Sequence, residues 1–311
     1  MHHLHITHAI GRTPLVELRH CSPKPEVRLF AKLEGWNPTG SVKDRIVRQM
    51  LFDAQRDIGI QPGDTVIEAS TGNTGIALAM VGRALGYDVR VVMPENVYPE
   101  IPRALAVYGA AVEWVPADQG VRRAIEVARG HAKRKGWFFL DQFGNDSNAR
   151  AHYETTGVEL LEDLPEIDVF VAGLGTGGSV MGAGRRLKEA NPRTKVIAVE
   201  PHPGNQLQGL KSLADGFIPP ILDLNFLDGK ILVRSGHAFR AAAELMRREA
   251  IFAGVSSGAV LHAGLKLARR RDRGNIVLLF ADNGWKYLGT NLWNVQPESS
   301  EEEDLDDTIW W

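Results

Sequence analysis

The sequence predicts an α/β protein built on parallel sheets. Short β-branched runs alternate with helical stretches along almost the whole chain of 311 residues, which is typical of parallel strands connected by helices. The helical stretches carry apolar residues at three-four spacing, as between Val121 and Lys135, so each has a face that can pack on a sheet. At about 100–200 residues per domain, the length indicates two domains.

The elements of the first half follow in order from these rules. A β-branched run comes first, a turn follows at Gly35–Gly40, and Ser41 is a candidate N-cap for the next helix. The unit then repeats. We expect strands at Val27–Glu34, Thr65–Ala69, Asp88–Met93 and Ala111–Val115, and helices at Ser41–Arg56, from Gly72 onward, at Glu100–Tyr108 and at Val121–Lys135.

The second half continues the alternation. Turn residues cluster at Phe143–Ala149 and mark a domain boundary. After this boundary we expect strands at Val169–Gly173, Lys195–Glu200 and Asn275–Asp282, and helices beginning at Ser235 and at Ser256 or Ser257.

Composition excludes several classes of protein. The chain is 44% hydrophobic and 24% charged, which is ordinary for a globular domain, and its net charge of −2 gives no general attraction to nucleic acid. A single cysteine, Cys21, excludes a disulfide framework and a multi-cysteine metal site. No apolar run reaches the roughly 20 residues that span a bilayer, and the N-terminus does not have the pattern of a signal peptide. We therefore expect a cytoplasmic enzyme.

Four strand-to-helix turns carry candidate site residues. The first is NPTGSVKDR at Asn37–Arg45, which puts Lys43 in the first turn of a helix. The positive end of the helix dipole disfavours an ammonium there, so a neutral or covalently bound amine fits the position better. A solvated surface lysine is the alternative.

The second turn is EASTGNTG at Glu68–Gly75. Its hydroxyl groups and the free N–H groups of a helix start could bind a carboxylate or a phosphate. Helix capping by small residues accounts for the segment equally well.

The third turn, GLGTGGS at Gly173–Ser179, is a phosphate cradle because its glycines admit close approach to backbone N–H groups. It also matches the dinucleotide-binding pattern G-x-G-x-x-G, and Glu200 ends the next strand where a ribose-binding acid is expected. An NAD(P)-dependent oxidoreductase is therefore an alternative. The fourth turn, GVSSG at Gly254–Gly258, is by itself an N-cap. Because ligands of open α/β sheets bind outside the carboxyl ends of the strands, we expect the four turns to face one cleft.

These segments together resemble the cysteine synthases (O-acetylserine sulfhydrylases), B-type, of the fold-type-II pyridoxal-phosphate enzymes. The resemblance covers nearly the whole chain apart from the tail. It rests on LEGWNPTGSVKDR, IEASTGNTGIALAM, MPEN, LDQFGN, AHYETTG, GLGTGGS and IFAGVSSGA, which occur in the family's order.

The resemblance implies a role for each matching residue. Lys43 would hold pyridoxal 5′-phosphate (PLP) as a Schiff base and act as the catalytic base. Asn73 and Ser256 would contact the cofactor ring. The cradle Gly175, Thr176, Gly177, Gly178 and Ser179 would bind its phosphate. The substrate would contact Ser70, Thr71, Gly72, Asn73, Thr74 and Gln142, with Gly209 and Lys211 at the entrance. No metal is expected.

The implied reaction is a PLP-dependent β-replacement that forms L-cysteine from an O-activated serine. O-acetyl-L-serine or O-phospho-L-serine would supply an α-aminoacrylate intermediate in a ping-pong mechanism. Sulfide, thiosulfate or a protein thiocarboxylate would supply the sulfur. A PLP-dependent serine/threonine dehydratase and a cystathionine synthase remain alternatives.

The resemblance also implies two open, twisted, mainly parallel sheets flanked by helices, with the active site in the cleft between two domains of a homodimer. The expected N-terminal domain is 35–147, with a smaller mobile part around 88–135. Residues 1–34 and 148–293 form the second domain.

The last stretch, 294–311, is a separate acidic tail. Seven acidic residues and no basic ones lie between Glu298 and Trp311. A solvated linker is the usual explanation of such a run, but two terminal tryptophans need a surface to pack on. We expect Trp310 and Trp311 to close over the cleft near the 70–74 loop.

Overall fold

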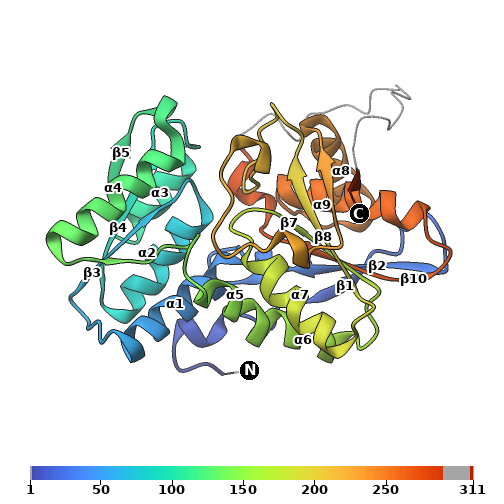
Figure 1. Ribbon diagram of the computed structural model, residues 1–311, viewed down its shortest axis with the longest axis horizontal. Coiled ribbons are helices and arrows are strands. Elements are labelled where there is room, and N and C mark those ends of the chain that lie inside the picture. Colours follow the sequence, from blue (N-terminus) through green and yellow to red (C-terminus); the bar gives the residue numbers. More distant parts are fainter. Residues whose placement is uncertain (1, 290–308, 311) are drawn as a thin grey trace. The chain divides into compact units, whose positions relative to one another are not determined.

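The computed structural model describes residues 2–289 and the backbone of residues 309–310. Within these ranges the chain forms two compact units. Unit 1 contains residues 2–11 and 37–151, and unit 2 contains residues 12–36 and 152 onward. Each unit has its own sheet with its own helices (Figure 1). Within residues 2–289 there is no helix with the length and apolar character needed to cross a membrane.

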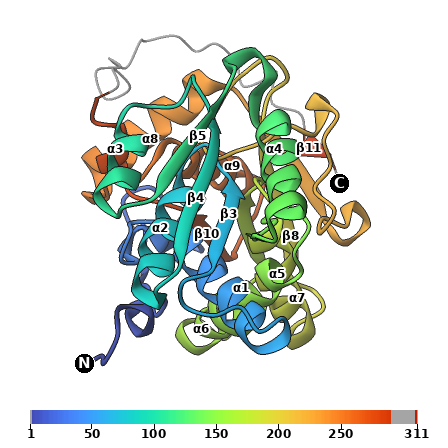
Figure 2. The same cartoon turned by 90° about the vertical axis from the view of Figure 1, so that its left-hand side faces the viewer.

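Unit 1 contains a four-stranded sheet in the order β5-β4-β3-β6, and every neighbouring pair is parallel (Figure 2). Its strands are β3 (Thr65–Ala69), β4 (Asp88–Pro94), β5 (Ala111–Val115) and β6 (Phe138–Phe139). Its helices are η1 (Ile6–Ala9), α1 (Lys43–Asp57), α2 (Asn73–Leu85), α3 (Glu100–Val107), η3 (Ala117–Gln119), α4 (Gly120–Lys135) and α5 (Ser147–Ala151).

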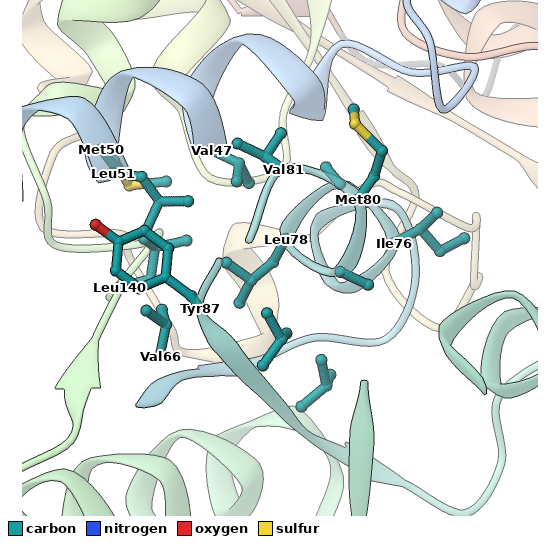
Figure 3. Close-up of a cluster of buried hydrophobic side chains, with 14 of the residues drawn as sticks. Val47, Met50, Leu51, Val66, Ile76, Leu78, Met80, Val81, Tyr87 and Leu140 are labelled. Carbon is teal, nitrogen blue, oxygen red and sulfur yellow. The ribbon is translucent and has the colours of Figure 1, made fainter. Parts of the chain in front are cut away.

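The central strand β3 is buried on both faces, which explains why it is apolar at neighbouring positions. Val66 packs in the cluster that joins α1 and α2 to the sheet (Figure 3). Its neighbour Ile67 packs in a second cluster with Ala124 and Ala128 of α4. Successive side chains of a strand point to opposite faces, so a strand covered on both sides has apolar residues at consecutive positions.

Unit 2 contains a seven-stranded sheet in the order β1-β2-β10-β7-β8-β9-β11. The five central strands are parallel, and β1 and β11 pair antiparallel at the two edges. The strands are β1 (Leu15–Glu17), β2 (Val27–Leu33), β7 (Val169–Gly173), β8 (Lys195–Pro201), β9 (Gly229–Val233), β10 (Gly274–Phe280) and β11 (Ile309–Trp310).

The helices of unit 2 pack on this sheet and on each other. α9 contacts β10 and β7, α7 contacts β7 and β8, and α8 packs against α9 (Figure 1). The helices are η2 (Glu34–Trp36), the π-helix η4 (His152–Thr156), α6 (Gly157–Asp163), α7 (Gly178–Ala190), η5 (Leu213–Asp215), η6 (Leu224–Phe226), α8 (Ser235–Glu249), α9 (Val255–Arg269) and η7 (Gly284–Tyr287).

The predicted α/β class and the mainly parallel sheets are confirmed, and every predicted strand and helix is present. Four strands were not predicted: β1, β6 and β11 have two or three residues, and β9 has five. The strands of two or three residues are too short to show a period. One helix start also differs. The N-cap of α1 is Val42 rather than Ser41, although the Lys43 N–H donates to Ser41 Oγ at 3.4 Å.

The beginning of the chain belongs to a different unit from the one predicted. Residues 2–11 belong to unit 1, whereas the sequence analysis grouped residues 1–34 with the second domain. The cause is a set of hydrogen bonds to unit 1: His5 Nε2 donates to the Ala84 carbonyl at 3.2 Å, and Arg48 Nη1 donates to the carbonyls of Thr7 (3.2 Å) and Ile10 (3.0 Å).

Candidate active site

In unit 1, a hydrogen-bonded turn presents Lys43 as the first residue of α1. The Gly40 N–H donates to the Asn37 carbonyl at 2.8 Å, and Gly40 has φ +80°, a conformation that favours glycine. The buried carboxylate of Asp44 accepts the Thr39 N–H at 2.8 Å and also places a negative charge in the first helical turn. Lys43 itself is half-buried. The turn therefore holds an amine in a defined place without enclosing it.

The 70–74 loop precedes α2, and the hydroxyl of Ser70 organises it. Ser70 Oγ accepts the N–H groups of Gly72 at 3.1 Å and Gly75 at 2.9 Å. Gly75 leaves room for this arrangement, because a Cβ there would lie 3.2 Å from Val91 Cγ1 and 3.4 Å from Ser70 Cβ. Ser70 thus caps the helix, one of the two roles that the sequence left open.

Gln142 joins this loop from a distant part of the chain. Its side-chain Oε1 accepts the Thr74 hydroxyl at 2.6 Å, and its Nε2 donates to the Ala69 carbonyl at 2.8 Å. Asn148 Nδ2 in turn donates to the Gln142 carbonyl at 2.7 Å. The predicted residues Ser70, Thr74 and Gln142 therefore form one cluster, with Thr71, Gly72 and Asn73 on the same loop.

Sequence analysis missed Glu68, which lies beneath this cluster. Its side chain is completely buried, and its oxygens accept the N–H groups of Ala69 at 2.8 Å and Gln142 at 3.1 Å. Burial raises the pKa of Glu68 to about 8, and the two backbone hydrogen bonds only partly oppose that rise. The sequence feature that could have revealed Glu68 is an acidic residue among apolar ones near the end of a predicted strand.

In unit 2, the glycines of the 173–179 segment allow neighbouring groups to pack directly against its backbone, and this segment is the predicted cradle. A Cβ on Gly173 would lie 2.4 Å from Leu210 Cδ2, and one on Gly175 would lie 2.9 Å from the Gly209 carbonyl oxygen. Gly177 has φ +90° and is the N-cap of α7. The N–H groups of the first turn of this 13-residue helix follow directly, as phosphate binding requires, and that of Gly178 donates to Thr176 Oγ1 at 3.4 Å.

The 206–216 loop is attached to this cradle. The Lys211 N–H donates to the Leu174 carbonyl at 2.7 Å, and Gly209 has φ +86°. A Cβ on Gly209 would lie 3.8 Å from Ser256 Oγ. The predicted residues Gly175–Ser179, Gly209, Lys211 and Ser256 are thus neighbours. Burial lowers the pKa of the Lys211 amine, and Asp215 opposes that shift.

Glu200 does not have the role that a dinucleotide-binding protein would require. It is buried, Oε1 lies 2.7 Å from Lys230 Nζ, and Oε2 accepts the Leu213 N–H at 2.7 Å. The two oxygens therefore face Lys230 and the backbone of Leu213, and the buried carboxylate holds segments of the protein together. The G-x-G-x-x-G match has no acidic partner, which removes the main support for an oxidoreductase.

His152 is a second residue that the sequence did not single out. Its Nε2 lies 3.2 Å from Ser179 Oγ in the cradle, and its Nδ1 lies 2.9 Å from Thr156 Oγ1. It is buried within the π-helix η4, and π-helical turns occur frequently at functional sites. The imidazole therefore orients the cradle hydroxyl.

The C-terminal tail and possible metal ligands are the remaining features considered in the sequence. Trp311 lies outside the described residues, as does most of the acidic tail, while the backbone of Ile309–Trp310 pairs with β9 at the sheet edge. Among residues 2–289 no three His, Cys, Asp or Glu side chains are grouped as metal ligands would be.

Comparisons with known proteins agree with this chemistry. The family described as pyridoxal-phosphate dependent enzyme matches residues 6–282. A cysteine synthase of Aquifex aeolicus is 43% identical over 296 residues, which are 92% of this chain and 90% of that protein. The crystal structure of an Entamoeba histolytica cysteine synthase is 34% identical, with a TM-score of 0.90 over 96% of this chain and 93% of that one. An O-ureido-L-serine synthase has the same TM-score and identity over 97% and 98% of the two chains.

Proposed function

The chain belongs to the pyridoxal-phosphate-dependent enzymes and, within them, to the cysteine synthases, and we propose that it is a transferase that makes L-cysteine from an O-activated serine. O-acetyl-L-serine is the proposed donor of the carbon skeleton and sulfide the proposed source of sulfur. The single observation that carries the proposal is the extent of the relationship: identity to a cysteine synthase is 43% over 92% of the chain, and the family match over residues 6–282 includes every segment that contributes to the site.

We propose that Lys43, Asn73, Ser256 and the cradle Gly175–Ser179 hold PLP. The start of α7 supports this assignment, because Gly177 is its N-cap with φ +90° and the N–H groups of the first helical turn follow it. Gly173 and Gly175 allow Leu210 and the Gly209 carbonyl to pack directly against the cradle. When bound, PLP supplies an electron sink for the negative charge that develops at Cα of the amino acid. Ser256 offers a neutral hydroxyl to the ring, and a hydroxyl does not hold a pyridine nitrogen protonated as a carboxylate would. A hydroxyl at this position therefore favours loss of the substrate's β-substituent over racemisation at its Cα.

The chain's own groups would bind the substrate and move its protons. Thr71, Asn73 and Thr74, with the N–H groups of the α2 start, would bind the substrate carboxylate, and the Ser70 hydroxyl and Gln142 would hold the loop in shape. The Lys43 amine would remove the Cα proton and return it to the same carbon after sulfur has added at Cβ. Lys211 at the entrance would face an anionic leaving group or sulfur donor. Its lowered pKa is consistent with a place at the rim of a desolvated site.

Replacing Lys43 by alanine tests this function. We expect wild-type protein to carry covalently bound cofactor at residue 43, found by borohydride reduction and peptide mass spectrometry, and to form cysteine from O-acetyl-L-serine and sulfide. In the Lys43→Ala protein we expect loss of the covalent attachment and a fall in turnover of about 10²–10⁴-fold or more. The exposed Lys133→Ala on α4 is the matched control and should leave both unchanged. A Lys43→Ala protein with wild-type turnover would contradict the assignment.

We also propose a homodimer in the cytoplasm. Two strongly exposed tryptophans of unit 2, Trp36 and Trp285, line a pocket of about 500 Å³, and exposed apolar surface of this kind is usually covered by a partner. Cys21 is a free buried thiol, as is common for proteins of reducing compartments.

A further inference from the structure

A carboxyl group that the reaction does not use lies under the 70–74 loop. Glu68 is the fourth residue of β3, and its side chain has no exposed surface. No lysine, arginine or histidine among residues 2–289 pairs with it. Its oxygens accept the N–H groups of Ala69 and Gln142 instead. Burying a carboxyl without a cation is costly, so its presence here needs an explanation.

The geometry shows what the carboxyl does. β3 and β6 pair in parallel only at two positions, and the last ladder hydrogen bond runs from the Leu140 N–H to the Ile67 carbonyl at 3.1 Å. Beyond it the chain turns at Asp141, which has φ +54°. Glu68 Oε2 then accepts the Gln142 N–H at 3.1 Å, so the side chain continues the pairing where the backbone no longer can.

This contact decides where the Gln142 side chain lies. With the Gln142 backbone held by Glu68, its amide reaches both the Ala69 carbonyl (2.8 Å) and the Thr74 hydroxyl (2.6 Å). Glu68 Oε1 holds the Ala69 N–H of the same segment at 2.8 Å. The carboxyl therefore joins two pieces of chain, 74 residues apart, that together form the cluster.

We propose that Glu68 is a positioning residue that fixes Gln142 against the 70–74 loop and makes the affinity of this loop for an amino-acid carboxylate depend on pH. The proposal rests on the proposed function, because it takes the 70–74 loop to be the carboxylate site. Glu68 touches neither substrate nor cofactor in this account and acts through the groups that it holds.

The electrostatic environment supports the pH dependence. Burial is the main cause that raises the pKa of Glu68 to about 8, and the neighbouring carboxylate of Asp141 adds to it. Glu68 lies on the same face of β3 as Val66, which is the face covered by α1 and α2. The charged groups of the elements on this face include Lys43, Asp44, Arg45, Arg48 and Asp53 of α1 and Arg150 of α5. Asp44 accepts the Thr39 N–H, Arg48 donates to the Thr7 and Ile10 carbonyls, and Arg150 pairs with Asp53. At neutral pH the Glu68 side chain is therefore mostly protonated and uncharged.

Ionisation above pH 8 would bring a negative charge beneath a site built for an anion. Like charges in a poorly solvated place repel, so the affinity for a substrate carboxylate falls as the pH rises through 8. Linkage requires the converse as well: a bound carboxylate raises the pKa of Glu68.

The raised pKa of Glu68 also makes the stability of the fold depend on pH. Because the folded-state pKa exceeds the ordinary value of 4.5, this group's contribution to stability is complete below pH 4.5 and is lost as the pH rises toward 8.

The test compares wild-type holoenzyme with Glu68→Gln, using L-alanine as an amino acid that has no β-leaving group. Its dissociation constant is measured by calorimetry between pH 6.5 and 9.5. The amine of L-alanine titrates equally with both proteins, so we compare the ratio of the two constants. We expect wild type to lose affinity relative to Glu68→Gln by on the order of tenfold across this range. The exposed Glu95→Gln, just after β4, is the matched control and should keep the wild-type profile.

A second measurement uses wild-type protein alone, in case Glu68→Gln does not fold. Infrared spectroscopy detects the C=O stretch of a protonated carboxyl. We expect such a band at pH 7, lost on titration near pH 8, with its midpoint moved upward by saturating L-alanine. A ratio that does not change with pH, or a midpoint that L-alanine does not move, overturns the role of Glu68 alone. Failure of the wild-type holoenzyme to bind any amino acid overturns the proposed function as well.

Discussion

Two charged side chains of β2 show how burial decides the value of an ion pair. Lys32 Nζ lies 3.0 Å from Glu159 Oε2 and donates to the Thr13 carbonyl at 2.6 Å, and its side chain is fully buried. Four residues earlier on the strand, Arg28 Nη2 lies 3.0 Å from Glu17 Oε2, but 48% of its side chain is exposed. The shortest nitrogen–oxygen distance is the same in the two pairs, and the main difference between them is that the Lys32 side chain is buried and the Arg28 side chain is half exposed.

We therefore expect Lys32→Ala and Arg28→Ala to differ strongly in stability. Removing the Lys32 ammonium deprives the largely buried Glu159 carboxylate of its counter-charge, which costs about 3–5 kcal/mol of unfolding free energy. Removing Arg28 should cost about 0–1 kcal/mol, since water screens an exposed pair. Urea unfolding of the two variants checks this. Equal losses would show that burial is not the deciding factor.

At the scale of the element, glycines determine how closely α8 and α9 pack. A Cβ on Gly258, near the start of α9, would lie 2.0 Å from the Ala238 carbonyl oxygen of α8 and 2.9 Å from Ala242 Cβ. Ser256 is also on α9, so the packing of α9 against α8 determines where this proposed cofactor-binding residue lies.

Gly258→Ala should push the two helices apart. We expect a loss of about 1–3 kcal/mol in unfolding free energy, because overpacking a rigid contact forces the backbone to move. The control is Gly236→Ala on α8, where a Cβ would meet nothing within 4 Å. It should leave stability unchanged or raise it by up to about 1 kcal/mol. Thermal or urea unfolding separates the two, and a neutral Gly258→Ala would contradict the packing argument.

At the scale of the molecule, the two units carry different parts of the proposed chemistry. Unit 1 contributes Lys43 and the carboxylate loop, while unit 2 contributes the cradle and Ser256. Each group is assembled inside its own unit by short hydrogen bonds and close glycine contacts. Unit 2 also exposes a surface around Trp36 (73% exposed) and Trp285 (66% exposed), with Phe252 packed edge-on against Trp285 at 5.1 Å between ring centroids.

We expect the double variant Trp36→Glu/Trp285→Glu to weaken the proposed homodimer by at least about 100-fold in its dissociation constant. Buried tryptophans at the centre of an interface typically contribute 2 kcal/mol or more each. Size-exclusion chromatography with light scattering measures the mass over a range of concentrations. Trp114→Glu, at an exposed position of β5 in unit 1, is the control. A wild-type protein that is monomeric at all concentrations would refute the dimer.

How far the sequence predicts this site depends on the range of the interactions. The turns around Lys43, the 70–74 loop and the glycine cradle were found because their signals are local: a glycine where φ is positive, and a hydroxyl before a helix. Glu68 and His152 were missed because their partners, Gln142 and Ser179, are distant in the chain. The alternative that made Glu200 a ribose ligand arose because its neighbour Lys230 lies on another strand, which the sequence does not show.

The amino-acid sequence by itself determined the α/β class and the order of the main strands and helices, and it pointed to the turns that are proposed to carry chemistry. Backbone stereochemistry and hydrophobic periodicity act over a few residues, so they can be read without coordinates. Only the tertiary structure decided which carboxyl groups are buried, what each one holds, and which of the short strands form. Desolvation and long-range pairing depend on neighbours that the fold alone brings together.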